Sequence, residues 1–265
     1  MTIKEKESYP HSVDLKNIVH KEFMQYLSQL DLSKILFLDI ETVPMHSSYA
    51  NMDPSWQKLW EKKSKSLTKD DITPSDLYDR AAIYAEFGKI VCIGVGVVTG
   101  HPTQPKLRLK SFFGDDEKKI LEDFAQLLNS HFGTDRHRLC AHNGKEFDFP
   151  YIARRMLVHG IKIPFLLDNA GKKPWEINNL DTMELWKFGD FKSFVSLNLL
   201  AHLFNIPTPK DDIDGSMVAD VYYRDKDIER IAIYCNKDVI TLVQVLLKLM
   251  NKEVIPPEDI QLPEM

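Results

Sequence analysis

The sequence has few cysteines, no excess of positive charge and no long apolar run. Its three cysteines, Cys92, Cys140 and Cys235, lie far apart and form no C-x-x-C pair. This spacing argues against a disulfide framework or a cysteine zinc site, and it favours a reducing cytosol. The chain has 34 basic and 39 acidic residues and a net charge of −5. That balance excludes a wholly polycationic nucleic-acid binder but leaves room for a local basic groove.

No segment is long and apolar enough to span a membrane. The strongest apolar stretch, residues 90–98, has the length of a strand and falls well short of the about 20 residues of a spanning helix. The N-terminus, MTIKEKESYPHSVDLK, contains acids and no apolar core, so it does not have the pattern of a signal peptide. We therefore expect a cytoplasmic protein with no membrane partner.

The rest of the composition is that of a globular chain. It has 265 residues, of which 43% are hydrophobic and 28% charged, which excludes a disordered or fibrous protein. Apolar runs of strand length lie at 35–40, 89–98, 106–113 and 138–141, and helical patterns lie at 18–30, 115–131, 150–159, 196–204, 217–223 and 226–251. Strands followed by alternating helices predict a mixed α/β sheet covered by helices.

Two carboxylates end the first predicted strand, in the run ILFLDIET. Side chains at positions i and i+2 of a strand point to the same face, so Asp39 and Glu41 project side by side. A hydrophobic core does not hold two adjacent carboxylates without compensation. Either this strand end is open to water, or a cation lies between the two side chains.

Two further acids have structural explanations of their own. Asp148 follows the fourth predicted strand and can cap the helix predicted from about Pro150. Asp238 lies four residues after Tyr234 in a predicted helix, so the two side chains share a face and can pair at its surface. Together, however, the acids follow a specific order along the chain: D-x-E, then N-x-x-x-F-D, then Y-x-x-x-D.

That order resembles the DEDD superfamily of 3′–5′ exonucleases, over about residues 35–249. A tyrosine four residues before the last acid is typical of the Tyr-containing subclass; the histidine of the other subclass would stand at Ile233. The segments at 86–96 and 142–152 are most similar to the proofreading exonuclease domain of family-B DNA polymerases, and this chain resembles a stand-alone form of that domain. The motifs that carry the resemblance are FLDIETVP (37–44), EFGKIVCIGVG (86–96), HNGKEFDFPYI (142–152) and YCNKD (234–238).

The resemblance implies a ribonuclease H-like fold, an α/β mixed sheet flanked by helices. On that basis we expect an N-terminal extension with one helix at 1–34 and the exonuclease domain at 35–251. A polar, helix-prone insertion occupies about 45–88, with Pro54 and Pro74 as helix start signals, and a proline-rich surface tail occupies 252–265.

The resemblance also implies two divalent cations. Asp39, Glu41, Asp148 and Asp238 match the metal-binding acids of the family, and Tyr234 matches the tyrosine that orients the attacking water. Carboxylate and water ligands suit Mg²⁺ or Mn²⁺, and no cluster of soft ligands in the sequence indicates zinc. Without a cation, four clustered carboxylates would repel one another.

Three residues beside the acids are candidates for substrate binding. Thr42 can donate to the terminal nucleotide. Asn143 can bind substrate or metal-bound water, or simply hold a turn. Phe147 can stack on a base or pack beneath the site. Asp181 is a fifth acid, which either supports the site or caps the next helical turn.

A basic and aromatic segment follows the first strand. Its lysines can contact phosphates and its tryptophans can stack on bases, or the segment is a solvated helix face with the tryptophans packed inward. The residues concerned are Trp56, Lys58, Trp60, Lys62, Lys63, Lys65 and Lys69.

These observations lead to one principal hypothesis and two alternatives. The principal hypothesis is a metal-dependent 3′–5′ exonuclease that releases nucleoside 5′-monophosphates from a single-stranded or frayed 3′ end. The first alternative is a non-catalytic nucleic-acid-binding module on the same fold, whose signature would be the loss of an acid. The second is an exoribonuclease that trims RNA, because no motif reveals contacts to the 2′-OH that separates RNA from DNA.

Overall fold

The computed structural model describes residues 25, 27–67, 72–190, 192–207 and 213–263. The chain divides into two compact units, residues 1–31 and 32–265. The helix predicted at 18–30 falls mainly outside the described residues. The fold and the candidate site belong to the second unit.

A six-stranded mixed sheet forms the centre of this unit, in the order β5-β4-β1-β2-β3-β6. β1 and β2 are antiparallel, as are β2 and β3, whereas β4, β5 and β6 each run parallel to a neighbour. The four predicted strands are confirmed, and β1 and β2 extend beyond the predicted ends. The strands are β1 (Ile35–Pro44), β2 (Gly88–His101), β3 (Gln104–Phe113), β4 (Arg138–Ala141), β5 (Leu180–Asp181) and β6 (Ile260–Gln261).

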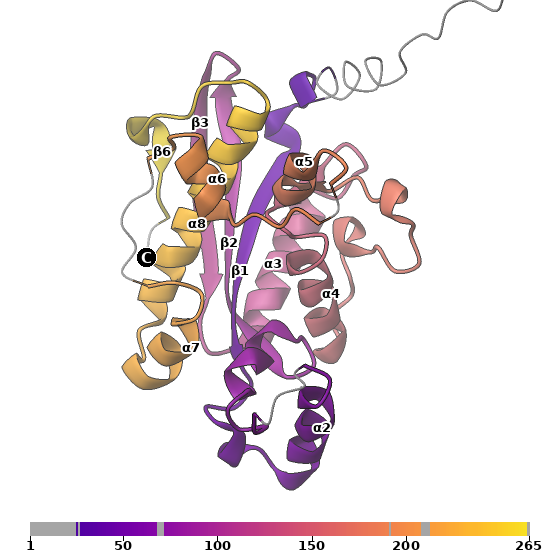
Figure 1. Cartoon of the computed structure of the whole chain (residues 1–265). Coiled ribbons are helices and arrows are strands. Elements are labelled where there is room, and N and C mark those ends of the chain that lie inside the picture. The colour runs from indigo at the N-terminus through magenta and orange to yellow at the C-terminus, as the bar shows by residue number, and fades with distance from the viewer. Residues whose placement is uncertain (1–24, 26, 68–71, 191, 208–212, 264–265) are drawn as a thin grey trace, which may run out of the picture. The chain divides into compact units, whose positions relative to one another are not determined.

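Helices cover both faces of the sheet. Leu36, Leu38 and Ile40 of β1 pack into one core with α3 and α4, whereas Val43 packs into another with α7 and α8. Helix α8 packs on β1, β2 and β3, and Figure 1 shows it lying beside β2 and β3. The helices are α2 (Pro54–Ser64), α3 (Glu117–His131), α4 (Asp148–Val158), α5 (Thr182–Lys187), α6 (Leu197–Leu203), α7 (Val218–Asp220) and α8 (Ile228–Leu249). None of the helices in the described part of the chain is long and apolar enough to cross a membrane.

The boundary before α8 differs from the predicted one. The helix predicted at 217–223 is the short α7 followed by a π-helical turn, Val221–Asp225. Lys226, predicted to open α8, adopts a left-handed backbone with φ 58° and ends that turn instead. Asp227 then caps α8, because its side chain accepts a hydrogen bond from the Arg230 backbone N–H at 3.1 Å.

The insertion at 45–88 has an aromatic core of its own. Asp53 caps α2, with Pro54 in the first turn as predicted. Trp60 is fully buried, and its indole Nε1 donates to the Pro74 carbonyl at 2.7 Å. Pro74 does not start a helix, contrary to the prediction, because the next helical turn among the described residues is the 3-10 segment Tyr78–Ile83. The burial of Trp60 also removes it from any stacking on bases.

Most of the C-terminal tail is exposed or partly exposed, in line with the predicted surface position, and part of it also pairs with the edge of the sheet. β6 pairs with β3, at the far edge from β5. Ile255 before it is buried, and its backbone is held by the buried side chain of Gln244 in α8. The amide of Gln244 donates to the Ile255 carbonyl at 2.7 Å and accepts from the Ile255 N–H at 2.9 Å. The proline-rich composition of the tail did not reveal the contact between Ile255 and Gln244, because Gln244 lies in a distant segment, helix α8.

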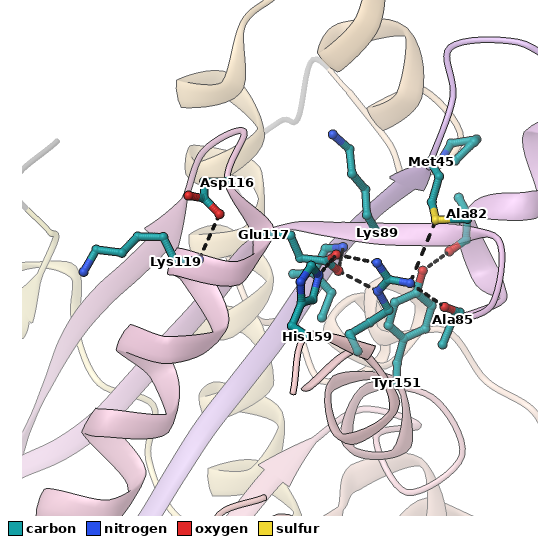
Figure 2. A network of polar contacts seen from close by, with 12 residues as sticks. Met45, Ala82, Ala85, Lys89, Asp116, Glu117, Lys119, Tyr151 and His159 are labelled. Carbon is teal, nitrogen blue, oxygen red and sulfur yellow. Dashed lines mark hydrogen bonds and ion pairs between the residues drawn. The ribbon is translucent and has the colours of Figure 1, made fainter. Parts of the chain in front are cut away.

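A buried ionic network joins α3, α4 and the insertion. Arg155 of α4 donates to Glu117 at 2.8 and 2.5 Å and to the Ala85 carbonyl at 3.0 Å. The same carboxylate of Glu117 contacts His159 at 2.7 Å and accepts from the Ile90 backbone N–H at 2.7 Å. Figure 2 shows Glu117 and His159 together, beside Tyr151. The network fixes the orientation of α4, whose first residue is Asp148.

Replacement of Arg155 by Met is expected to lower the free energy of unfolding by about 3–5 kcal/mol, because it leaves the charge of Glu117 buried without its partner. Arg155 and Glu117 have side chains only 5% exposed. Urea denaturation measures the loss. Lys119→Met is the control, since it breaks an exposed pair with Asp123 and should change stability little. Equal losses in both variants would contradict a structural role for the network.

Candidate active site

The end of β1 presents the two acids of the D-x-E motif. Glu41 is only 7% exposed, whereas Asp39 is partly exposed. The pairing of β1 with β2 shifts by a β-bulge between Glu41 and Thr42, an irregularity that re-aims side chains next to functional sites. Asp39 lies under α8, where the thiol of Cys235 contacts its carboxylate Oδ2 at 3.5 Å.

Helix α8 brings Tyr234 and Asp238 to the same place. They are one helical turn apart, and the Tyr234 hydroxyl is hydrogen-bonded to the Asp238 carboxylate. Burial, and then the charges of Asp238, Glu41 and Asp39, raise the pKa of Tyr234. The tyrosine is therefore a neutral hydrogen-bond donor beside the acids of β1.

Asp148 reaches the site from the start of α4. It is 3% exposed, and its carboxylate is held by its own backbone and by that of Ile40 in β1. Burial raises the pKa of Asp148 to about 7, and the charge of Asp181 adds to the shift. The helix starts at Asp148 rather than near Pro150, with Phe147 in the cap position, so capping is not the main role of this acid.

The electrostatics link the two acids of β1 to Asp148 and Asp238. Burial raises the pKa of Asp39 well above its usual range, and the charges of Asp238 and Asp148 raise it further. Burial also raises the pKa of Glu41, with contributions from Asp39, Asp238 and Asp148. Asp148 and Asp238 therefore lie close enough to the two acids of β1 to oppose the ionisation of Asp39 and Glu41.

The residues present fit a divalent cation. Glu41 is buried as a residue, yet none of the described residues forms a hydrogen bond or ion pair with its carboxylate. Ligand atoms of Asp39, Glu41 and Cys235 all lie within 4.8 Å of one another. A buried carboxylate without a donor, among others that repel it, is stabilised by a bound cation.

The three predicted substrate-binding residues make different local contacts. The Thr42 hydroxyl is hydrogen-bonded to Tyr151, on the α4 side of the sheet. Phe147 is half-buried and packs on Tyr151, with ring centroids 5.4 Å apart. Asn143 has a left-handed backbone, φ 64°, and so makes the turn after β4. Phe147 therefore has the packing role that the sequence analysis considered, and Asn143 has the turn role.

Asp181 has both of the roles that the sequence left open. Its carboxylate caps α5, accepting from the Met183 and Glu184 backbone N–H groups. It also accepts from the backbone N–H groups of Asn143 at 2.9 Å and Lys145 at 3.0 Å. Asp181 therefore shapes the loop that carries Asp148.

Sequence reasoning did not include Cys235 among the residues of the site. The signal was available: Cys235 is three residues before Asp238, so the two side chains share a helix face. Its thiol contacts the Asp39 carbonyl at 3.4 Å as well as the carboxylate. Gly94 of β2 makes room for it, since a Cβ at Gly94 would lie 2.8 Å from the Cys235 sulfur.

The fold and the clustered acids define a DEDD exonuclease-like domain of the ribonuclease H-like class. The family model described as a predicted 3′–5′ exonuclease related to the exonuclease domain of PolB matches residues 83–255, and the chain belongs to this family. The matched range contains Asp148, Tyr234 and Asp238, whereas Asp39 and Glu41 precede it.

Individual proteins show more distant likeness. A DNA polymerase from Pyrococcus glycovorans is 22% identical over 135 residues, 46% of this chain and 17% of the polymerase. The family B DNA polymerase structure from the archaeon Pyrobaculum calidifontis matches with a TM-score of 0.51 and 15% identity, covering 82% of this chain and 24% of that one. The structure of the RNase domain of yeast Pop2 matches with a TM-score of 0.40 and 13% identity, covering 93% of this chain and 88% of that domain. The chain thus spans less than a quarter of the length of the polymerases it matches.

Proposed function

We propose that the chain is a metal-dependent 3′–5′ exonuclease acting on single-stranded or frayed 3′ ends. The observation that carries this proposal is the buried carboxylate cluster in which Glu41 has no donor among the described residues. Membership of an exonuclease family supports it. The non-catalytic alternative would be favoured by the loss of an acid, but Asp39, Glu41, Asp148, Asp238 and Tyr234 are all in place.

Asp39, Glu41, Asp148 and Asp238 are the residues that would hold two divalent ions, Mg²⁺ or Mn²⁺. Such ions, when bound, activate water and stabilise the leaving 3′ oxygen. The Tyr234 hydroxyl orients the attacking water beside Asp238. The backbone of Ile40 keeps the Asp148 carboxylate turned toward β1, and Asp181 holds the preceding loop in shape.

The substrate strand meets the site along its rim. Thr42, Asn143 and Phe147 are candidates for contacts to the terminal nucleotide, Thr42 and Asn143 through their backbone or polar groups and Phe147 through the exposed part of its ring. A paired 3′ end has to melt before it reaches a cluster this deeply buried, which favours single strands.

End-labelled oligonucleotides test the proposal directly. Single-stranded DNA and RNA of the same sequence, labelled at the 5′ end, are incubated with Mg²⁺ or Mn²⁺. A ladder shortened from the 3′ end, with release of nucleoside 5′-monophosphates, is expected. Preference for the RNA strand would identify the trimming exoribonuclease, and tight binding without any product would identify the non-catalytic module.

Charge reversal on α2 is expected to weaken substrate binding. Lys58, Lys62 and Lys65 are exposed and follow a spacing of four and three residues, so they form one basic face. Lys63 is different, since its ammonium lies 4.2 Å from the Tyr84 ring centroid. If the basic face contacts phosphates, the triple reversal to Glu should lower affinity and flatten its salt dependence, because each lost phosphate contact reduces counterion release.

Fluorescence anisotropy with a labelled single strand at several salt concentrations measures both quantities. The matched control reverses Lys118 and Lys119, which are exposed on α3. Metal binding should be unchanged in both variants. An unaltered salt slope in the α2 variant would assign this face to solvent.

A further inference from the structure

Cys235 adds a soft ligand to a site otherwise made of oxygen donors. Its sulfur and carboxylate oxygens of Asp39 and Glu41 all lie within 4.8 Å of one another. The three side chains come from two elements, β1 and α8, that the core holds together. The sequence contains no zinc-binding cysteine pair, and only the packing of α8 on β1 produces this combination.

Two further observations point to a ligand at this position. Glu41 is only 7% exposed as a residue, and its carboxylate has no hydrogen-bond or ion-pair partner in the described part of the chain. The space for the sulfur is also built in, since a side chain at Gly94 would approach Cys235 to 2.8 Å. The sulfur lies against β2 at Gly94 and 3.5 Å from the Asp39 carboxylate.

We propose that Cys235, Asp39 and Glu41 form a binding site for a thiophilic divalent cation of the Zn²⁺ class. Thiolate ligands favour such ions, whereas Mg²⁺ and Mn²⁺ prefer oxygen donors. Binding forms an ion–sulfur bond and breaks the S–H bond, and the proton passes to solvent. The inference rests on the proposed function insofar as Asp39 and Glu41 belong to both sites, so a soft ion excludes the catalytic ions.

Co²⁺ is a suitable probe, because a thiolate bond to it gives a charge-transfer absorption band that oxygen ligands do not give. The wild-type protein with Co²⁺ is expected to show the band, and Zn²⁺ should abolish it by displacement. Cys235→Ser should lose the band. It should also weaken Zn²⁺ binding by at least about tenfold, the lower end of what the loss of even an outer-shell partner costs, while Mn²⁺ affinity stays unchanged.

Cys140→Ser is the matched control. Like Cys235, Cys140 is a free and buried cysteine, but it lies in β4 and is not part of the group formed by Asp39, Glu41 and Cys235. Its replacement should therefore leave the band intact. A band that persists in Cys235→Ser, or Zn²⁺ affinity equal in both variants, would overturn the proposal.

X-ray absorption on the Zn²⁺-loaded wild-type protein keeps the test independent of how the variants fold. A Zn–S distance of about 2.3 Å is expected, and a shell of oxygen and nitrogen alone would overturn the site. These readouts are separate from hydrolysis. A Co²⁺ band in a protein that never degrades oligonucleotides would leave this site standing and remove the proposed function.

Discussion

Asp39→Ala is expected to abolish metal-dependent hydrolysis without unfolding the protein. The substitution removes a carboxylate from the cluster that would hold the ions. Asp39→Asn should have the same effect while keeping the shape of the side chain. Single-turnover rates on a short labelled oligonucleotide measure the loss. Full activity in Asp39→Ala would eliminate the metal mechanism.

The same substitutions should stabilise the metal-free fold. A carboxyl with a higher pKa in the folded than in the unfolded state destabilises the fold when it is ionised. For Asp148, whose pKa is raised from 3.8 to about 7, this penalty is absent below about pH 4 and complete above about pH 7. Removing the charge of Asp39 relieves its repulsion with Asp148 and Asp238. The melting temperature in chelator should therefore rise more at pH 8 than at pH 5.

Asp135→Ala is a control for both measurements, since Asp135 is exposed in the turn before β4. It should change neither the rate nor the melting temperature. If Asp39→Asn instead lowered the melting temperature at pH 8, the carboxylate of Asp39 would have a stabilising partner rather than repelling neighbours.

The pairing of Asp39 with Glu41 on β1, and of Tyr234 with Asp238 on α8, could be predicted because each pair depends on local periodicity. Residues 39 and 41 share a face in any strand, and residues 234 and 238 share a face in any helix. Apolar runs likewise predicted the strands that carry and surround them. The resemblance then joined these local pairs into one site, a step that spacing alone did not supply.

What the sequence did not predict depends on contacts between distant segments. The sequence offered Asp181 two alternative roles, and it did not show that one carboxylate performs both because β5 lies beside β4 in the sheet. Gln244 recruits the backbone of Ile255 from the tail. Cys235 becomes part of the site only through the packing of α8 on β1 and the absence of a side chain at Gly94.

Tyr234→Phe should give a slow enzyme that still depends on metal. The ring keeps its packing and the four acids remain, so only the hydroxyl is lost. Because burial and the neighbouring acids raise the pKa of Tyr234, the hydroxyl stays protonated and acts by positioning water, not as a base. We expect a loss of about 10²–10⁴-fold, the range of positioned proton-transfer groups, with no change in the shape of the rate profile between neutral and mildly alkaline pH.

Tyr223→Phe is the matched control, because Tyr223 packs against the same core and donates to the Pro44 carbonyl at 2.5 Å. Its loss should lower stability but leave the single-turnover rate of the folded enzyme almost unchanged. The comparison thus separates the removal of any partly buried hydroxyl from the removal of the one that faces Asp238. Equal rates in wild type and Tyr234→Phe would make Tyr234 a packing residue, and the catalytic proposal would then rest on Asp39, Glu41, Asp148 and Asp238 alone.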